Sequence, residues 1–200
     1  MLHRPIRVTE TGTPGAPSIL VVGCVHGNEP AGIAVARDLI TDPAPHGVLL
    51  WVIPSLNPDG VVGGTRQNAH GVDLNRNFPW RWQRIGNPGG LYYSGPHALS
   101  EPESRLARRL ILGRGPYVSI WFHQHENLVD ESGGDIGIER RYASLTDMRL
   151  GRLPRYPGSA VGWQNHRLPG TTAFVVELPA GSLSPRAVER FSDAIPRLLR

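Results

Sequence analysis

Short apolar runs recur along the chain, and each is bounded by glycine, proline or polar residues. Runs of roughly four to eight such residues are typical of strands that are buried within a sheet. The pattern predicts four strands, at residues 18–25, 48–53, 118–122 and 173–176. Between these runs, apolar residues recur with the spacing of a helix face, which predicts helices between the strands.

Three helices are expected from their apolar spacing and their start signals. The first covers about residues 31–40, with apolar side chains on a shared face. The second is expected to open at Ser100, because Ser100 and Glu103 have the spacing of a capping box. The third follows Ser184, a capping residue, with Pro185 at the first helical position.

Strands that alternate with helices predict an α/β fold, an open sheet with helices on both faces. No linker or internal repeat is visible, so we expect a single catalytic domain over residues 1–200. Residues 56–99 are rich in Gly, Asn and Pro, and loops of that length usually carry function. Residues 128–169 look similarly irregular and are expected to form a flap over the same face of the molecule.

Composition narrows the classes of function. The formal net charge is +4, which is compatible with acidic substrates, but no aromatic and basic motif for nucleic acid accompanies it. No apolar run approaches the ~18 residues of a membrane span. The start of the chain lacks the apolar core of a signal peptide, which predicts a cytoplasmic protein, with a trimmed secreted form as the alternative. The single cysteine, Cys24, is expected to be a buried small hydrophobe.

Candidate chemistry lies where the predicted strands end. His26 and Glu29 follow the first strand, His123 follows the third, and Glu177 follows the fourth. The carboxyl ends of strands in open α/β sheets meet at one edge, where ligands bind. Zinc takes His and carboxylate ligands, and a catalytic site adds a third protein ligand and water. The H-x-x-E pair alone is weak evidence, because a surface His beside a first-turn Glu is the ordinary alternative.

A second polar motif, GVDLNRNF at residues 71–78, lies in the first long loop. It belongs to a set that resembles the zinc carboxypeptidases, and within them the murein peptide amidases that trim bacterial cell-wall peptides. The matching pieces occur in the family's order over roughly residues 18–181: HGNEP, NPDG, TRQNAHGVDLNRNF, WFHQHENLVD, PGSAVGW and VVELPAG. The resemblance implies a mixed, mostly parallel sheet of the zinc carboxypeptidase type.

The resemblance also implies one zinc ion per chain, held by His26, Glu29 and His123. Glu177 would then serve first as general base and afterwards as general acid, a role that suits a carboxylate beside the attacking water. His125 follows the same strand and is the alternative ligand. The order of residues after His123 in the family favours His123.

The long loop would supply the groups that hold the substrate. By resemblance, Arg66 polarises the scissile carbonyl, and fixed positive charge suits the oxyanion that forms there. Asn75 and Arg76 would hold the carboxylate of the released residue, which a planar guanidinium can bind in bidentate fashion. Asp73 would orient the ring of His26 from behind. Tyr156 lies at the spacing of a mobile tyrosine of the digestive carboxypeptidases and is left outside the expected catalytic set.

The expected reaction is hydrolysis of an amide next to a carboxylate-bearing residue, in a small peptide partner with a free carboxylate. The murein amidase branch implies a γ-D-glutamyl-diaminopimelate bond. An N-acyl amino-acid deacylase of the aspartoacylase or succinylglutamate desuccinylase type is the nearest alternative, although NPDG and ELPAG favour the first assignment. A catalytically inactive zinc-binding or peptide-binding domain is a further alternative, and Glu177 argues against it. The sequence specifies no oligomeric state.

Overall fold

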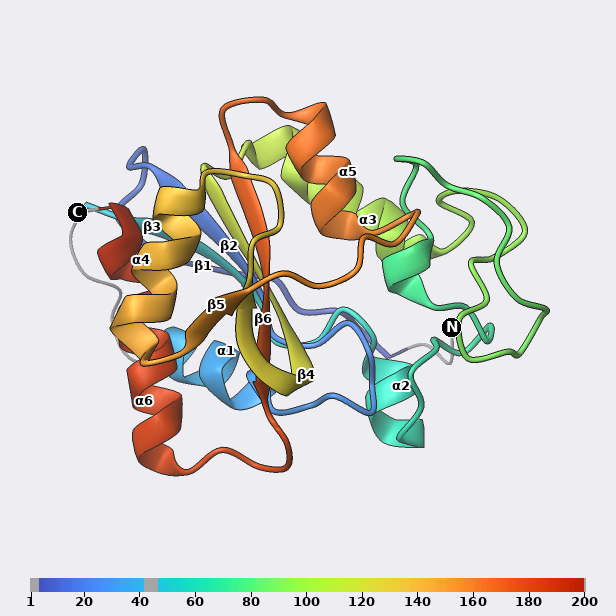
Figure 1. The fold of residues 1–200 in the computed structure, drawn as a ribbon, viewed down its shortest axis with the longest axis horizontal. Helices are drawn as coiled ribbons and strands as arrows, with labels where there is room; N and C mark the ends of the chain where they lie inside the picture. The colour runs from blue at the N-terminus through green and yellow to red at the C-terminus, as the bar shows by residue number, and fades with distance from the viewer. Residues whose placement is uncertain (1–3, 42–46, 200) are drawn as a thin grey trace.

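The computed structural model describes residues 4–41 and 47–199. A six-stranded sheet runs through its centre in the order β1-β3-β2-β4-β5, with β6 also paired to β4 (Figure 1). β1 pairs antiparallel with β3, and the other pairings are parallel. The predicted mixed, mostly parallel sheet is therefore confirmed. Its strands are β1 Thr9–Gly12, β2 Ser18–Val22, β3 Leu49–Ile53, β4 Val118–Asp130, β5 Arg149–Gly151 and β6 Thr172–Pro179.

Helices cover both faces of this sheet, as the alternating pattern predicts. One face packs against α1, α4 and α6, and the other packs against α3 and α5 (Figure 1). The short helices α2 and η1 lie in the long loop, and η2 follows α6. The helices are α1 Gly32–Thr41, α2 Pro58–Gly63, η1 Leu74–Arg76, α3 Pro102–Arg114, α4 Ile136–Thr146, α5 Ala160–Arg167, α6 Pro185–Ala194 and η2 Pro196–Leu199.

The central strand β2 shows why an uninterrupted apolar run folds as a strand here. Ile19 and Val21 point to the face covered by α1, whereas Leu20 and Val22 point to the face covered by α3. All four side chains are at most 1% exposed. Because alternate residues of a strand face opposite sides, a strand covered by helices on both sides needs apolar residues at every position.

Two predictions about local structure are wrong. Residues 128–169 do not form an irregular flap, since they contain the end of β4, then α4, β5 and α5. The helix α3 does not begin with a capping box either. Its N-cap residue is Glu101, which makes no side-chain cap hydrogen bond, and Ser100 Oγ donates to Glu101 Oε1. The Ser184 cap is confirmed, because its side chain accepts a hydrogen bond from the backbone N–H of Ala187.

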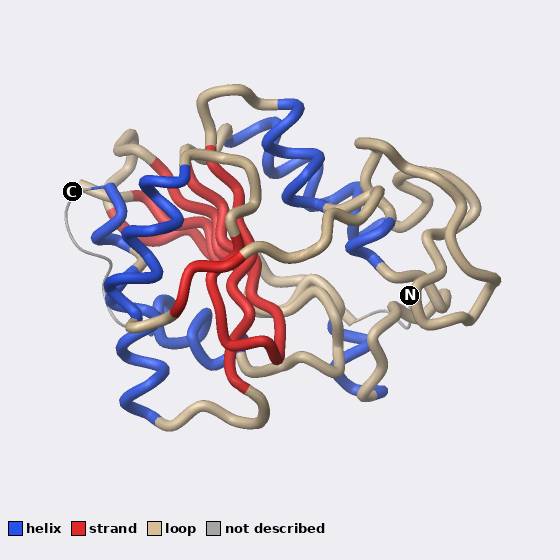
Figure 2. The backbone as a smooth tube through the Cα atoms, in the orientation of Figure 1, coloured by secondary structure: helices blue, strands red, loops and turns tan. Residues whose placement is uncertain are grey.

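The long loop between β3 and α3 lies to one side of the sheet. Figure 2 shows this loop as extended tan segments beside α2 and α3. The side chain of Asn57 caps α2, and the side chain of Asp73 caps η1. Hydrogen bonds from polar side chains thus give the loop local order without long helices or strands. In the described ranges, no helix has both the length and the apolar character needed to cross a bilayer.

Candidate metal centre and active-site pocket

Three side chains converge at the carboxyl edge of the sheet. His26 follows β2, Glu29 lies in the turn before α1, and His123 lies within β4. His26 Nδ1 is 3.0 Å from Glu29 Oε2, and His123 Nδ1 is 2.9 Å from the same oxygen. The two Nδ1 atoms are 3.1 Å apart. His26, Glu29 and His123 are 1%, 8% and 4% exposed, so their three donor atoms lie in a largely buried site.

The turn that carries His26 and Glu29 depends on a close approach of two backbones. A Cβ atom on Gly27 would lie 1.9 Å from the carbonyl carbon of Gly60, so only glycine fits at this position. Gly60 belongs to the NPDG motif, in which Asn57 Oδ1 accepts a hydrogen bond from the Gly60 N–H. The HGNEP and NPDG motifs are therefore two sides of one contact.

The geometry and chemistry of these donors fit a zinc ion. Two imidazole nitrogens and a carboxylate oxygen form a typical catalytic zinc set, which leaves room for water or substrate. Ligands about 2.0–2.1 Å from an ion in tetrahedral geometry lie about 3.3 Å apart, close to the observed separations. His26 Nε2 lies 3.0 Å from Asp73 Oδ1, which favours a proton on Nε2 and leaves the Nδ1 lone pair facing the other donors.

The charges around this triad compensate one another. Burial alone would raise the pKa of Glu29, but its contacts with His123 and His26 hold it well below its usual range. The pKa of Asp73 is likewise lowered against the effect of burial, by His26 and Arg66. Burial lowers the pKa of His26, but the two carboxylates outweigh this effect and raise it. Both carboxylates are thus ionised at neutral pH.

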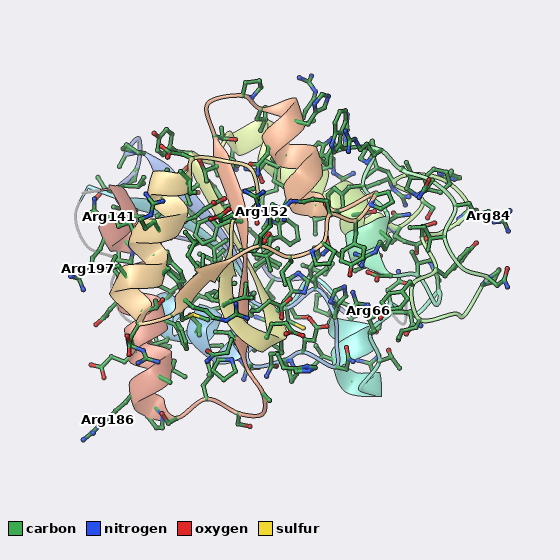
Figure 3. All side chains as sticks on the ribbon, in the orientation of Figure 1. Arg66, Arg84, Arg141, Arg152, Arg186 and Arg197 are labelled. Carbon is green, nitrogen blue, oxygen red and sulfur yellow. The ribbon has the colours of Figure 1, made fainter. Side chains whose placement is uncertain are left out.

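Arg66 lies between the carboxylates of Glu29 and Asp73 and forms an ion pair with each. Arg66 donates from Nη1 to Glu29 Oε1 and from Nε to Asp73 Oδ2, both at 2.9 Å. In Figure 3, Arg66 lies within the outline of the molecule, whereas Arg84 and Arg186 extend from its periphery. The two carboxylates fix the guanidinium of Arg66 in place, with 15% of the side chain exposed.

Asn75 and Arg76 lie next to His123. Asn75 Nδ2 is 3.4 Å from His123 Nε2, and Asn75 Oδ1 accepts a hydrogen bond from the Ala160 N–H. Arg76 donates to the backbone carbonyl of Asn75, and its guanidinium carbon lies 4.2 Å from the ring centroid of Tyr156. A cation stacked on an aromatic ring in this way keeps its position without a carboxylate partner.

Glu177 lies directly opposite His123 in the pairing of β6 with β4. Side chains of paired residues point to the same face of a sheet, so the carboxylate of Glu177 lies beside the triad. Its Oε2 atom is buried and has no hydrogen-bond partner within residues 4–41 and 47–199. Burial raises the pKa of Glu177, and the nearby His123 offsets part of the rise. A carboxylate in this state is suited to accepting a proton.

These residues line one cavity of about 170 Å³. Pockets that bury a drug-sized ligand have volumes of ~300–1,000 Å³, so this cavity is sized for about one amino-acid residue. His26, Glu29, Arg66, Asn75, Arg76, His123 and Glu177 all line it, and Asp73 lies behind His26. His125 is exposed and does not line the cavity, although it is only two residues beyond His123.

The opposite wall of the cavity contains three residues that are not among the expected site residues, together with the already noted Tyr156. Asp130, Ser132 and Arg155 all line it, and so does Tyr156. Asp130 lies in the cavity wall because the pairing of β4 with β6 shifts register after His125, so that the end of β4 runs beside β6 again. No local pattern signals this return. The sequence offers two hints: these residues fall within the stretch 128–169 that is expected to lie over this face, and Arg155 directly precedes Tyr156.

The zinc carboxypeptidase family model matches residues 3–130. Murein peptide amidase A from Vibrio campbellii (strain ATCC BAA-1116) is 31% identical over 202 residues, which cover 90% of this chain and 77% of that protein. The matches to two further curated relatives cover only 7% and 48% of those proteins.

Solved structures show the same fold. The murein-tripeptide amidase from Escherichia coli O157 superposes with a TM-score of 0.74 at 25% identity, covering 95% of this chain and 83% of that one. A succinylglutamate desuccinylase from Silicibacter sp. TM1040 superposes with a TM-score of 0.66 at 16% identity, covering 97% of this chain and 59% of that one. The likeness to the desuccinylase shows a shared fold only.

Proposed function

Since the chain belongs to the zinc carboxypeptidase family and is a hydrolase, we propose that it cleaves an amide bond next to a carboxylate-bearing residue. One observation carries the proposal. Three donor atoms, 2.9 to 3.1 Å apart, lie beside a buried carboxylate oxygen that has no partner among the described residues. A binding domain without catalysis has no need for such a base.

His26, Glu29 and His123 would hold the zinc ion, and Asp73 would orient the ring of His26. When bound, zinc supplies Lewis-acid chemistry at the scissile carbonyl. Glu177 accepts a proton from the attacking water as the water oxygen bonds to the carbonyl carbon. The carbon–nitrogen bond then breaks, and Glu177 returns the proton to the leaving nitrogen.

Arg66 and Arg76 would bind different groups of the substrate. Arg66, fixed by Glu29 and Asp73, supplies positive charge next to the developing oxyanion. Arg76 and Asn75 bind the carboxylate of the released residue, since Arg76 has no carboxylate partner of its own in the described ranges. The cavity then encloses the released residue, and the rest of the substrate extends outward.

The substrate we propose is a murein peptide, cut at the γ-D-glutamyl-diaminopimelate bond. The support is the 31% identity to the Vibrio murein peptide amidase over most of both chains. An N-acyl amino-acid deacylase would share the metal site but would act on a different amide. Its substrates therefore belong in the test.

The first test measures metal content and hydrolysis together. Purified protein is analysed for zinc and incubated with L-Ala-γ-D-Glu-meso-diaminopimelate, with and without a chelator. We expect about one zinc per chain and release of diaminopimelate that the chelator abolishes. Zinc without cleavage would overturn the substrate assignment, and C-terminal peptides and N-acyl amino acids are assayed in parallel to replace it. No zinc after reconstitution would overturn the catalytic proposal itself.

A further inference from the structure

A second ionic group faces the active-site cavity, opposite the metal centre. Arg155 and Asp130 both line the cavity and form an ion pair, with Arg155 Nη1 2.6 Å from Asp130 Oδ2. The two partners differ sharply in exposure. The Asp130 side chain is 3% exposed, whereas the Arg155 side chain is 48% exposed. The carboxylate is thus part of the wall, and the guanidinium extends from it toward solvent and the cavity.

Both carboxylate oxygens of Asp130 already accept hydrogen bonds from the protein. Its Oδ1 accepts a hydrogen bond from the Leu153 N–H at 2.8 Å, and its Oδ2 accepts one from Ser132 Oγ at 2.6 Å as well as the one from Arg155. A buried carboxylate with every partner in place stabilises the chain around it and is not free to bind substrate. Its role toward Arg155 is therefore to fix one edge of the guanidinium.

Only one of the three guanidinium nitrogens of Arg155 donates a hydrogen bond within the described part of the chain. Its Nη1 donates to Asp130, and in the described part of the chain its Nε and Nη2 donate to no protein acceptor. A guanidinium has five N–H donors in a planar fork that matches a carboxylate. With one edge anchored, the other edge can bind a carboxylate at little further cost in side-chain entropy.

The other two cavity arginines are committed elsewhere. Arg66 is held by Glu29 and Asp73, and Arg76 lies against Tyr156 next to Asn75, where the proposed function places the first carboxylate. Arg155 is therefore a separate anion-binding group in the same small cavity. A single residue that occupies the cavity would need two carboxylates to satisfy both.

We propose that Arg155 selects substrates whose released residue carries a second carboxylate at the far end of its side chain. The inference rests on the proposed function, because it assumes that the released residue occupies this cavity. It makes Arg155 a specificity-determining residue and Asp130 the group that positions it. A side chain that ends in an amine alone would face a fixed cation and leave it unpaired.

Two matched peptides test this directly on the zinc-loaded wild-type protein. L-Ala-γ-D-Glu-meso-diaminopimelate and L-Ala-γ-D-Glu-L-Lys differ only in the carboxylate at the end of the last side chain. We expect kcat/KM to be at least about 10-fold higher for the first peptide, since a hydrogen-bonded charge pair is gained. Equal values for the two peptides would overturn the inference while leaving the proposed hydrolysis intact.

Variants locate the effect on one residue. Arg155→Gln should lower kcat/KM for the diaminopimelate peptide by about 10- to 100-fold and leave the lysine peptide within about 3-fold. Arg155→Lys should fall between, because it keeps the charge and loses the fork. Arg152→Gln is the matched control. Arg152 belongs to the same loop and pairs with Glu131, but it is 74% exposed and does not line the cavity.

The outcomes separate selectivity from simple structural support. An equal fall for both peptides in Arg155→Gln would mean that Arg155 only pins the loop, and the inference would be wrong. If neither peptide is cleaved, the proposed function fails instead. Calorimetric titration with free meso-diaminopimelate and free lysine then tests the inference without turnover, and no preference for diaminopimelate would overturn it.

Discussion

The metal edge and the opposite wall of the cavity are built in different ways. At the metal edge, His26 and His123 are delivered by β2 and β4, and they are at most 4% exposed. On the wall, Arg155 and Tyr156 belong to a loop after β5, and about half of each side chain is exposed. Buried strand ends hold atoms to the accuracy that chemistry needs, whereas loops can change side chains without disturbing the core.

The two regions also differ in how their charges are satisfied. At the metal edge, the carboxylates of Glu29 and Asp73 are paired with histidine and arginine side chains, and the pKa of each is lowered. On the wall, Asp130 is saturated while Arg155 keeps free donors in the described structure. The comparison predicts that changes at the metal edge abolish function, and that changes at the wall alter selectivity or stability by smaller amounts.

The largest effect is expected from a pair of histidine variants, which test whether the metal edge depends on His123 and not on His125. His123→Ala removes one of the three converging donors, so we expect loss of zinc and of all activity. His125→Ala, two residues along the same strand, alters an exposed side chain and should keep about one zinc per chain. Elemental analysis of both purified variants decides. Zinc retained in His123→Ala and lost in His125→Ala would reassign the ligand.

Glu177→Gln should separate catalysis from metal binding. The substitution keeps the shape of the side chain and removes the group that accepts the proton, while the three donor atoms stay in place. We expect normal zinc content and a fall in kcat of about 10²- to 10⁴-fold, the usual contribution of a general base. Near wild-type turnover would exclude Glu177 from the mechanism, whatever its position beside His123.

The same contrast explains how much the sequence predicts. The metal edge could be predicted because each residue follows a recognisable apolar strand, and parallel strands share one carboxyl edge. The wall could not, because Asp130 reaches the cavity only after β4 shifts register beside β6. Likewise, Ser100 has the spacing of a capping residue but is recruited by Asn77 and Glu101, so tertiary contacts override the local signal.

A variant of Arg76, in the loop that carries DLNRNF, tests whether binding of the terminal carboxylate of the substrate can be separated from the rate of hydrolysis. Arg76→Ala should raise KM for peptides with a free terminal carboxylate by about 10- to 100-fold, with a smaller change in kcat. Arg84→Ala, a change at an exposed arginine on the periphery, is the matched control (Figure 3). Steady-state kinetics with both variants measure the difference. An unchanged KM in Arg76→Ala would place the carboxylate elsewhere.

The smallest effect we predict concerns the stability of the wall and its dependence on pH. Glu139 is 1% exposed, and its Oε1 accepts a hydrogen bond from the Ser132 N–H behind the cavity. Its pKa is raised from 4.5 to about 7, mainly by burial and in part by Asp130, against the lowering effect of the Ser132 hydrogen bond and of Arg155. The folded state therefore holds a proton that the unfolded state releases.

Because the folded pKa of Glu139 is the higher one, its contribution to stability is fully present below pH 4.5 and is lost as the pH rises toward 7. Glu139→Gln mimics the protonated form and should remove this slope. The variant should then be more stable than the wild type above pH 7, by about 1–3 kcal/mol. Urea denaturation from pH 5 to 8 measures the effect. Parallel stability curves for the two proteins would show that Glu139 is already ionised in the folded wall, and that Arg155 compensates two carboxylates rather than one.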